Sequence, residues 1–545
     1  MLAMFAMFAI SPIALLASSL VGLFPILVLG QDNDIPFSAC PLIGAYYPPP
    51  TISASPGAFS QLQAKFTETF DKLIEDGGSE DYGPITPNTT SFSIVLFSGA
   101  ESMKDDPVLF EYHFTSPEDE ARTGTNLTAS TKVPVGDVTM VFTVYAWLVG
   151  MGEKWETPIT EFLPELADVQ GGLSVRWDEV TIGSLAGQMS GLSRLSFFDT
   201  FAEQRPVFLP DTTPVVSHAA FQLLAFAVER SVKGDGGGDW KSFLEDAVFD
   251  PLNMTSTALL EHGMDDVFAI EGLNTSRIGE PAALGLVTSI EDLARAGHSM
   301  LSSSLLPDAV TRRWLHPNMD TSNLRNGVGR PWEVYRAGSS AISPVLDVLT
   351  KSGSIGKYAS YFGLTVDFDA GFAIVAHDSS VEDGTLDLNV YADIASESLG
   401  YLQEFAAKEL ASRFTGNYKG GGGDDDYHAQ LNVTGSGPGL EVQKLSAGGK
   451  DLRAEAAGKL GVALPDLDFR VYPSNARDEA AGRQQFVAVF QDKGAPVDMG
   501  TPTCVTWQEV GAVLGDGYNL VFTLDGDGMS TGFELPRDNV SLRKL

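Results

Sequence analysis

The sequence predicts an α/β protein in which an antiparallel sheet flanked by helices is followed by a small antiparallel β-domain. Residues 59–114 read as an amphipathic helix followed by two strands with alternating polarity. Residues 133–148 are apolar on almost every side, which is typical of a helix inside a protein. After Arg413 the helical spacing ends, and short alternating segments continue to the C-terminus.

Length and charge limit the classes of function. A chain of 545 residues exceeds what one hydrophobic core usually supports, so two globular domains are expected. With 35 Lys and Arg against 71 Asp and Glu, the net charge is -36. This excess argues against binding nucleic acid or an anionic membrane surface through general electrostatics. It favours a soluble, acidic surface.

The N-terminal segment predicts export. Residues 1–30 contain no charged side chain, and polar residues 31–34 follow at once. We predict a signal peptide cut near Gly30, with a retained N-terminal anchor as the alternative. The protein is then secreted, or held at the membrane with its domains on the lumenal or extracellular side. An uncleaved segment is the only membrane contact we expect.

Sequons and cysteines agree with export. Glycosylation of Asn-x-Ser/Thr requires a eukaryotic secretory lumen, and six such sequons begin at Asn88, Asn126, Asn253, Asn274, Asn432 and Asn539. The chain has two cysteines, Cys40 and Cys504. The only intramolecular disulfide they can form joins the two ends of the chain, and two buried thiols are the alternative.

The first half of the chain predicts an arm and then an ordered domain. Residues 31–58 are rich in Pro and small residues, which indicates an extended arm. A helix over 59–74 and strands over 92–97 and 109–114 follow. In the apolar run 133–148 the first helical turn is expected near Asp137.

That run resembles the active-site helix of the serine β-lactamase and penicillin-binding-protein family. Four further segments resemble the family in its own order: residues 155–166, 182–192, 248–257 and 285–301. The resemblance covers roughly residues 60 to 400, and the arm and C-terminal extension resemble exported fungal members related to class C β-lactamases. It implies a sheet flanked by helices with an all-helical lobe, and hydrolysis or acyl transfer on an amide or ester through an acyl-serine.

Two of the family's three motifs are replaced in this chain. The family carries Ser-x-x-Lys in the first turn of the helix, where the Lys helps deprotonate the Ser. The aligned residues here are Asp137 and Met140. The family's Tyr-x-Asn motif aligns with Val216 and His218. An imidazole can transfer protons near neutral pH, although His218 could instead be a first-turn histidine that hydrogen-bonds its loop.

The third motif is retained in Lys351, Ser352 and Gly353, which resemble the family's Lys-Thr/Ser-Gly strand. Lys351 would supply a cation, Ser352 a hydroxyl donor and Gly353 a close backbone approach. We therefore expect these residues to bind a small ligand or substrate, with a carboxylate of the ligand at Lys351. Residues 361–367 and 371–376 read as the next pair of strands.

Asp137 admits three interpretations. It could cap the helix N-terminus, where free N–H groups and the helix dipole favour a carboxylate. It could form a buried ion pair with Lys351. It could also belong to a new acid/base site, in which His218 transfers protons while Asp137 and Lys351 fix charge. Thr139 is a weaker substitute nucleophile, because no base stands near it in the sequence.

Other candidates are interpreted as structural. Ser190 lies in a loop turn, His298 packs on a helix face, and the Ser-x-x-Lys spacing from Ser354 to Lys357 is a coincidence. The seven histidines are scattered, so neither a metal ion nor another cofactor is expected. The acidic stretch 424–426 and the turn at 525–528 lack the remaining ligands of a calcium motif.

The last part of the chain completes the domain plan. A helix over 401–413 precedes strands over 485–490 and 518–523 and a hairpin turn at 525–528. The expected divisions are 1–30 (targeting segment), 31–58 (arm), 59–413 (β-lactamase-like domain) and 414–545 (antiparallel β-domain).

Three functions remain open from the sequence. The first is an exported β-lactamase-like protein that no longer acts through an acyl-serine and retains a cleft that binds a small ligand. The second is an enzyme of altered acid/base chemistry on a fungal secondary metabolite. The third is a binding or structural role of the C-terminal β-domain. Fold does not decide among them, because a fold does not imply a function.

Overall fold

The structure is a computed structural model that describes residues 39–40, 46–51, 56–100, 107–169, 173–194, 205–232, 238–270, 273, 278–337, 345–381, 386–421, 426–435, 437–478, 480–495, 506–510 and 518–545. The predicted targeting segment, Asn274 and Cys504 lie outside these residues. The chain divides into two compact units, a larger one within 47–338 and 345–409, and a smaller one that contains 410–545. Among the described residues, no helix is both long and apolar enough to cross a membrane.

The larger unit is built on an antiparallel sheet with the strand order β4-β3-β13-β12-β11-β10-β9-β8. The central strands are buried along almost their whole length, which explains why their sequences are nearly continuous apolar runs. The strands are β3 (Thr90–Ser98), β4 (Val108–Phe114), β8 (Met319–Asp320), β9 (Asn326–Val328), β10 (Glu333–Ala337), β11 (Leu346–Ile355), β12 (Tyr358–Thr365) and β13 (Ala370–Asp378).

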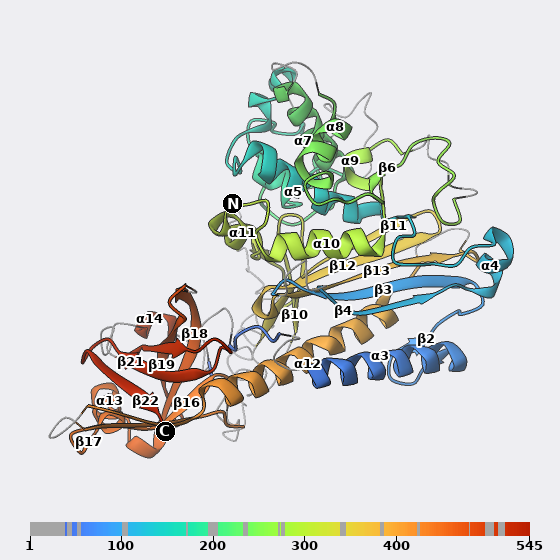
Figure 1. The fold of residues 1–545 in the computed structure, drawn as a ribbon. Coiled ribbons are helices and arrows are strands. Elements are labelled where there is room, and N and C mark those ends of the chain that lie inside the picture. Colours follow the sequence, from blue (N-terminus) through green and yellow to red (C-terminus); the bar gives the residue numbers. More distant parts are fainter. Residues whose placement is uncertain are drawn as a thin grey trace, which may run out of the picture. The chain divides into compact units, whose positions relative to one another are not determined.

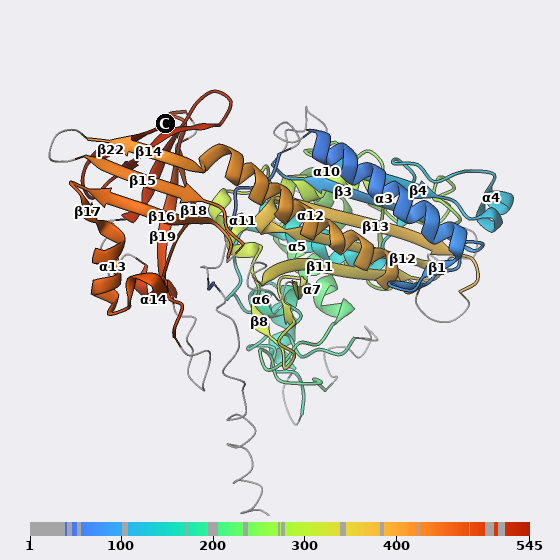
Figure 2. The same cartoon turned by 90° about the horizontal axis from the view of Figure 1, so that it is seen from below.

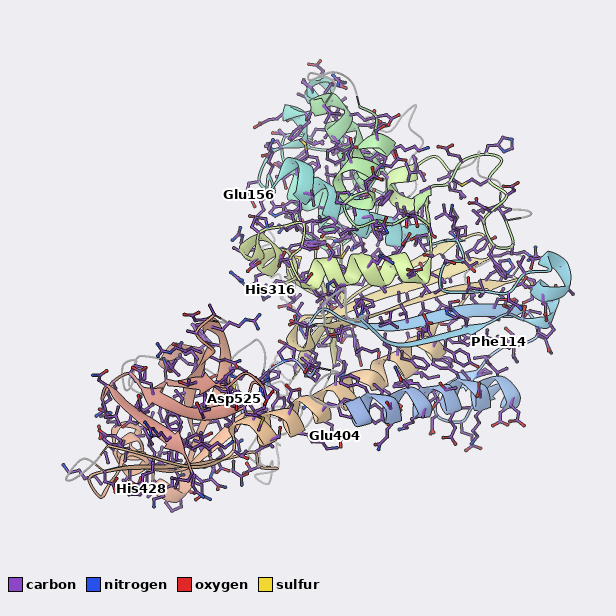
Figure 3. All side chains as sticks on the ribbon, viewed as in Figure 1. Phe114, Glu156, His316, Glu404, His428 and Asp525 are labelled. Carbon is purple, nitrogen blue, oxygen red and sulfur yellow. The ribbon has the colours of Figure 1, made fainter. Side chains whose placement is uncertain are left out.

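Helices cover both faces of this sheet (Figures 1 and 2). α3 (Pro56–Asp76) lies along one face beside the part of α12 (Asn389–Phe414) that belongs to this unit, and α10 (Ile290–Leu301) lies on the other face. Phe70 on α3 packs against Phe92 and Phe110 of the sheet. Side chains fill the space between α10 and the sheet (Figure 3).

An all-helical lobe sits above α10 and surrounds the apolar helix α5 (Thr139–Met151) (Figure 1). Residues 139–148 of α5 are all buried, because neighbouring helices surround it. The lobe also contains α6 (Ile182–Ala186), α7 (His218–Val232), α8 (Trp240–Leu244), a π-helical turn (Glu245–Phe249) and α9 (Pro281–Leu284).

The first helical turn of the apolar run 133–148 lies near Asp137, as predicted. Residues Val133–Pro134 form the strand β5, which pairs with β7 (Leu286–Thr288), and a 3-10 turn over Gly136–Val138 precedes α5. The remaining elements in the described part of the unit are β1 (Gly78–Ser79), β2 (Gly83–Pro84), α4 (Pro117–Thr123), β6 (Ala258–Leu259), α11 (Asp308–Trp314) and 3-10 turns over Ile159–Glu161, Pro164–Asp168 and Val366–Phe368.

The smaller unit is an antiparallel β-barrel. Its sheet runs β15-β14-β22-β21-β20-β19-β18-β16-β17, and a further pairing of β15 with β16 closes it. The strands are β14 (Gly416–Gly420), β15 (Tyr427–Asn432), β16 (Leu440–Ala447), β17 (Lys450–Asp451), β18 (Leu467–Asp478), β19 (Arg483–Asp492), β20 (Leu520–Leu524), β21 (Ser530–Leu535) and β22 (Val540–Lys544). The predicted fold class is confirmed, while closure of the second sheet was not predicted.

Aromatic side chains occupy the core of this unit. Phe522 lies 4.8 Å from Phe414 and 5.0 Å from Phe486 between ring centroids, and Tyr418 lies 4.9 Å from Phe533. The interior of a barrel of about eight strands is just wide enough to be filled by side chains. This cluster therefore forms a packed core. Helices α13 (Leu452–Leu460) and α14 (Thr506–Glu509) and a 3-10 turn over Leu464–Asp466 complete the unit.

The start of the described chain is tied to this smaller unit. The N–H of Cys40 donates to Oε1 of Gln491 at 2.7 Å, and its carbonyl accepts from Oγ1 of Thr506 at 2.9 Å. Cys40 is disulfide-bonded. Its predicted partner, Cys504, lies outside the described residues, so the pairing stays a prediction.

Candidate functional site

Two glycines allow the turn before α5 to lie directly against β11. Gly136 has a φ of +52°, the left-handed conformation that glycine adopts readily. A Cβ atom on Gly136 would lie 2.5 Å from the backbone of Ser354, and one on Gly353 would lie 2.2 Å from the carbonyl oxygen of Val135. This close approach places the side chain of Asp137 beside the strand.

Asp137 accepts hydrogen bonds from two other elements. Its Oδ1 lies 2.9 Å from Nε2 of His218, the first residue of α7, and its Oδ2 accepts the N–H of Ser354 at 3.3 Å. Neither the 3-10 turn nor α5 has a side-chain cap. The capping interpretation of Asp137 is therefore wrong, because the carboxylate faces α7 and β11 and not the N–H groups of its own helix.

The balance of forces on Asp137 favours the ionised carboxylate. Burial alone would raise its pKa, because a charge is poorly solvated in the interior. The hydrogen bond from His218, the charges of Lys351 and His218 and the N–H of Ser354 outweigh burial and hold the pKa of Asp137 below its usual value. At neutral pH Asp137 is therefore an anion and a weak base.

Lys351 is bound to a residue that no motif indicated. Its Nζ donates to Oε1 of Glu333, while Oε2 of Glu333 accepts the N–H of Ser352 at 3.0 Å and its hydroxyl at 2.8 Å. The Lys351 side chain is 2% exposed. The predicted direct ion pair between Asp137 and Lys351 is wrong, because Glu333 binds the ammonium and Lys351 acts on Asp137 only through its electric field.

The neighbours of Asp137 in the first turn offer no substitute nucleophile. Oγ1 of Thr139 donates to the carbonyl of Gly136 at 2.6 Å and accepts the N–H of Leu286 at 3.0 Å. Met140, which the sequence predicts at the position of the family's lysine, is fully buried. The Thr139 hydroxyl thus donates its hydrogen bond to the backbone and makes a structural contact.

A cleft of about 560 Å³ opens beside Asp137. Sites for small molecules usually measure roughly 300–1,000 Å³. The lining includes Asp137, Arg194, Val216, Lys351, Ser352 and Gly353. Of the predicted site residues, the structure thus brings Asp137, Val216 and the Lys351–Gly353 strand to one cleft. His218 does not line it, and contacts it through Asp137.

Two of the other sequence candidates, His298 and Lys357, make structural contacts. Nδ1 of His298 lies 2.9 Å from the carbonyl of Ser98, and Nζ of Lys357 donates to the carbonyl of Ser379. Ser190 is fully buried and does not line the cleft. None of these residues contacts Asp137.

In the described part of the chain, no group of three or more His, Cys, Asp and Glu side chains is arranged to hold a metal ion. Residues 424 and 425 of the acidic stretch lie outside that part. In the turn at 525–528, Oδ1 of Asp525 accepts the N–H of Asp527 at 3.0 Å and that of Met529 at 2.9 Å. This carboxylate therefore stabilises its own turn.

Comparison with known proteins decides the family. A model of the β-lactamase family matches residues 104–396, which is more than half of the chain. The chain belongs to the β-lactamase family. A second model, described as a β-lactamase-like C-terminal domain, matches residues 406–545 of this β-lactamase-family protein.

Individual relatives carry the same description. A β-lactamase-like protein of Arthroderma benhamiae is 24% identical over 582 aligned residues, which span 91% of this chain and 94% of the relative. A β-lactamase-like protein of Strobilurus tenacellus is 27% identical over 139 residues, 25% of this chain and 44% of the relative.

Among solved structures, similar ones include a class C β-lactamase mutant and a penicillin-binding protein homologue from Pyrococcus abyssi. The first has a TM-score of 0.45 and 15% identity and covers 62% of this chain and 98% of its own. The second has a TM-score of 0.47 and 15% identity and covers 88% of this chain and 99% of its own.

Sequence reasoning missed two parts of the site in this β-lactamase-family protein. Glu333 belongs to no motif, and it meets Lys351 only because β10 pairs with β11, with Glu333 opposite Thr350. Ser354 contributes a backbone N–H, which any residue except proline could supply. The only indication in the sequence is that Glu333 begins a short segment that precedes the strand of Lys351, and consecutive strands often pair.

Proposed function

We propose that this β-lactamase-family protein is exported and binds a small molecule in the cleft beside Asp137 without hydrolysing it through an acyl-serine. One observation carries the proposal. The carboxylate at the position of the family's nucleophile accepts both the hydrogen bond of His218 and the N–H of Ser354.

Acyl transfer needs a nucleophile with an activating base and free donors for the oxyanion that develops on the substrate. Asp137 has no hydroxyl, and its lowered pKa makes it a weak base. The N–H of Ser354 points at the side chain of residue 137, where an oxyanion would form next to the family's serine. In this chain an oxygen of Asp137 already accepts that N–H.

The charges in the cleft suggest how a ligand is held. Glu333 neutralises Lys351, so a ligand carboxylate is not expected at Lys351, in contrast to the expectation from the sequence. Arg194 lines the same cleft, is exposed, and makes no ion pair with any described residue. We therefore assign a carboxylate-bearing small molecule to the cleft, with Arg194 as its cation.

Export is the other part of the proposal. It is supported by the uncharged N-terminal segment and by the disulfide at Cys40, since disulfides persist in oxidising compartments. The proposed bridge joins Cys40 to Cys504. Five sequon asparagines lie exposed in the described part of the chain, at Asn88, Asn126, Asn253, Asn432 and Asn539.

The first experiment is a search for an acyl adduct. The purified full chain is incubated with a chromogenic β-lactam and a panel of small esters, and both product release and intact mass are followed. A functional serine β-lactamase serves as the positive control. We expect neither turnover nor a mass increase, and a covalent adduct or turnover abolished by Asp137→Asn would overturn the proposal.

The second experiment tests binding. A panel of small carboxylic acids and their neutral methyl esters is screened by thermal shift and then by calorimetry. Arg194→Ala should weaken binding of an acid about tenfold or more, since loss of a charge-assisted contact removes about 1.5–3 kcal/mol. Arg312→Ala changes an exposed arginine of α11 outside the cleft and should have no effect. Equal loss in both variants would contradict the assignment of Arg194.

A second candidate function is favoured by the contact of 2.9 Å between Asp137 and His218. A carboxylate paired with an imidazole is an arrangement used for general acid/base catalysis. The chain could then transform a fungal secondary metabolite without a covalent intermediate. Turnover that disappears in His218→Gln while ligand affinity persists would establish this candidate and displace the binding function.

A further inference from the structure

We propose that an N-linked glycan on Asn126 folds back into a second cleft of the larger unit and is held there by the protein. This inference rests on the proposed export, because only a chain that enters a secretory lumen receives such a glycan. The second cleft measures about 590 Å³, and Asn126 itself lies in its lining.

Two segments form the walls of the second cleft. One runs from the end of α4 at Arg122 to Lys132, and the other covers residues 265–270. The two segments are joined to each other at Lys132. Its carbonyl accepts the N–H of Phe268 at 2.9 Å, and its Nζ lies 2.6 Å from Oδ2 of Asp266. The cleft is thus formed before any ligand arrives.

The chemistry of the walls suits a sugar. The lining combines hydroxyl groups, an amide, carboxylates, cations and apolar side chains, with Thr125, Ser130 and Asp265 among the polar residues. Sugar hydroxyls both donate and accept hydrogen bonds, so they can use each of these groups. The exposed carboxylate of Asp265 makes no hydrogen bond with any described residue and is an available acceptor.

The sequon at Asn126 is held in position on its C-terminal side. Leu127 is buried, and its N–H donates to Oγ1 of Thr115 at 2.8 Å. The N–H of Thr128 donates to Oγ1 of Thr131 at 2.8 Å. Because the backbone is anchored while the Asn126 side chain stays exposed, a glycan attached to it starts inside the cleft.

The exposed asparagines of the other described sequons provide matched controls. Asn253, in the same unit, lines neither of the two large clefts and sits in a tight turn with a φ of +54°. A glycan on Asn253 should extend into solvent. The proposal therefore predicts a difference in accessibility between two glycans on the same molecule.

The test measures release of each glycan by a peptide N-glycosidase. The full chain is secreted from a eukaryotic host and digested under native conditions, and conversion of each asparagine to aspartate is followed by peptide mass spectrometry. We expect release at Asn126 to be about tenfold slower than at Asn253, the factor given by about 1.4 kcal/mol of contact free energy. After denaturation both sites should react at the same rate.

A variant in the cleft wall keeps the sequon intact. Asp265→Ala should speed native release at Asn126 about threefold or more, equivalent to losing one hydrogen bond of about 0.5–1.5 kcal/mol, and leave Asn253 unchanged. Asp178→Ala, an exposed residue of the same unit outside the cleft, is the matched control.

The outcomes separate this inference from the proposed export. Equal native release at Asn126 and Asn253, no effect of Asp265→Ala, or an unmodified Asn126 in a chain glycosylated elsewhere would overturn the glycan cleft alone. A chain from the same host that carries no glycan at any sequon and remains inside the cell would overturn both.

Discussion

Oδ1 of Asp137 and Nε2 of His218 lie 2.9 Å apart, and each side chain is 8% exposed. This contact joins the turn before α5 to the first residue of α7. Together with the N–H of Ser354, it satisfies the carboxylate that the sequence predicts at the position of the family's nucleophile. Other groups of the protein therefore already occupy both oxygens of this carboxylate in the cleft lining.

Asp137 should make stability depend on pH. The pKa of Asp137 is lower in the folded than in the unfolded protein. Its contribution to the free energy of unfolding is therefore complete at pH values above the unfolded pKa of about 3.9, and it is lost as the pH falls through the lower folded pKa. Asp137→Asn should be less stable than the parent by about 2 kcal/mol at pH 7, and the gap should shrink below about pH 4. Urea denaturation across this range measures the gap. A gap that widens on acidification would contradict the lowered pKa.

The pair of Glu333 and Lys351 should show strong coupling. Glu333→Ala leaves a buried ammonium without its partner and should destabilise the larger unit by about 3 kcal/mol, the low end for buried pairs because Glu333 is 36% exposed. The double variant Glu333→Ala with Lys351→Met should recover most of this loss. A double-mutant cycle by urea denaturation gives the coupling, and purely additive effects would refute the pair.

Gly353 should not tolerate a side chain. A Cβ there would lie 2.2 Å from the carbonyl oxygen of Val135 and 2.9 Å from the N atom of Val138. Gly353→Ala should lower the free energy of unfolding by about 3 kcal/mol, because both neighbours are backbone atoms that cannot move aside as a flexible side chain can. Gly400→Ala in α12 meets no atom within 4 Å and should stabilise by about 0.5–1 kcal/mol. Thermal unfolding compares the two, and similar shifts in both variants would count against the close approach.

Asp367 should change the stability of the protein with pH in the opposite direction to Asp137. Burial raises its pKa to about 6, and the charges of Asp347 and Asp369 add to the shift. Ionisation of Asp367 therefore destabilises the folded state. This loss of stability is absent below about pH 4, where the carboxyl group is protonated, and is complete above the folded pKa. Asp367→Asn should be more stable than the parent by about 1–2 kcal/mol at pH 7 and equal to it at pH 4. Unfolding free energies at the two pH values decide this, and an equal gain at both would be incompatible with a raised pKa.

Local patterns in the sequence predicted much of the fold. The apolar run around α5 and the alternating strands β3 and β4 were recognised because each element shows its own periodicity. Closure of the barrel was not recognised, since it depends on β14 pairing with β22 and β15 pairing with β16. No periodicity within a strand specifies its partner.

The sequence by itself determined which chemical groups are present: a carboxylate and a thioether at residues 137 and 140, an imidazole at 218, and the ammonium and hydroxyl of Lys351 and Ser352. Only the tertiary structure decided which of these groups meet. Asp137 bonds to His218 and not to Lys351, because the start of α7 brings His218 to it and the register of β10 on β11 places Glu333 beside Lys351. Hydrogen bonds act over about 3 Å, so such pairings between residues far apart in sequence form only once the strands and helices have packed.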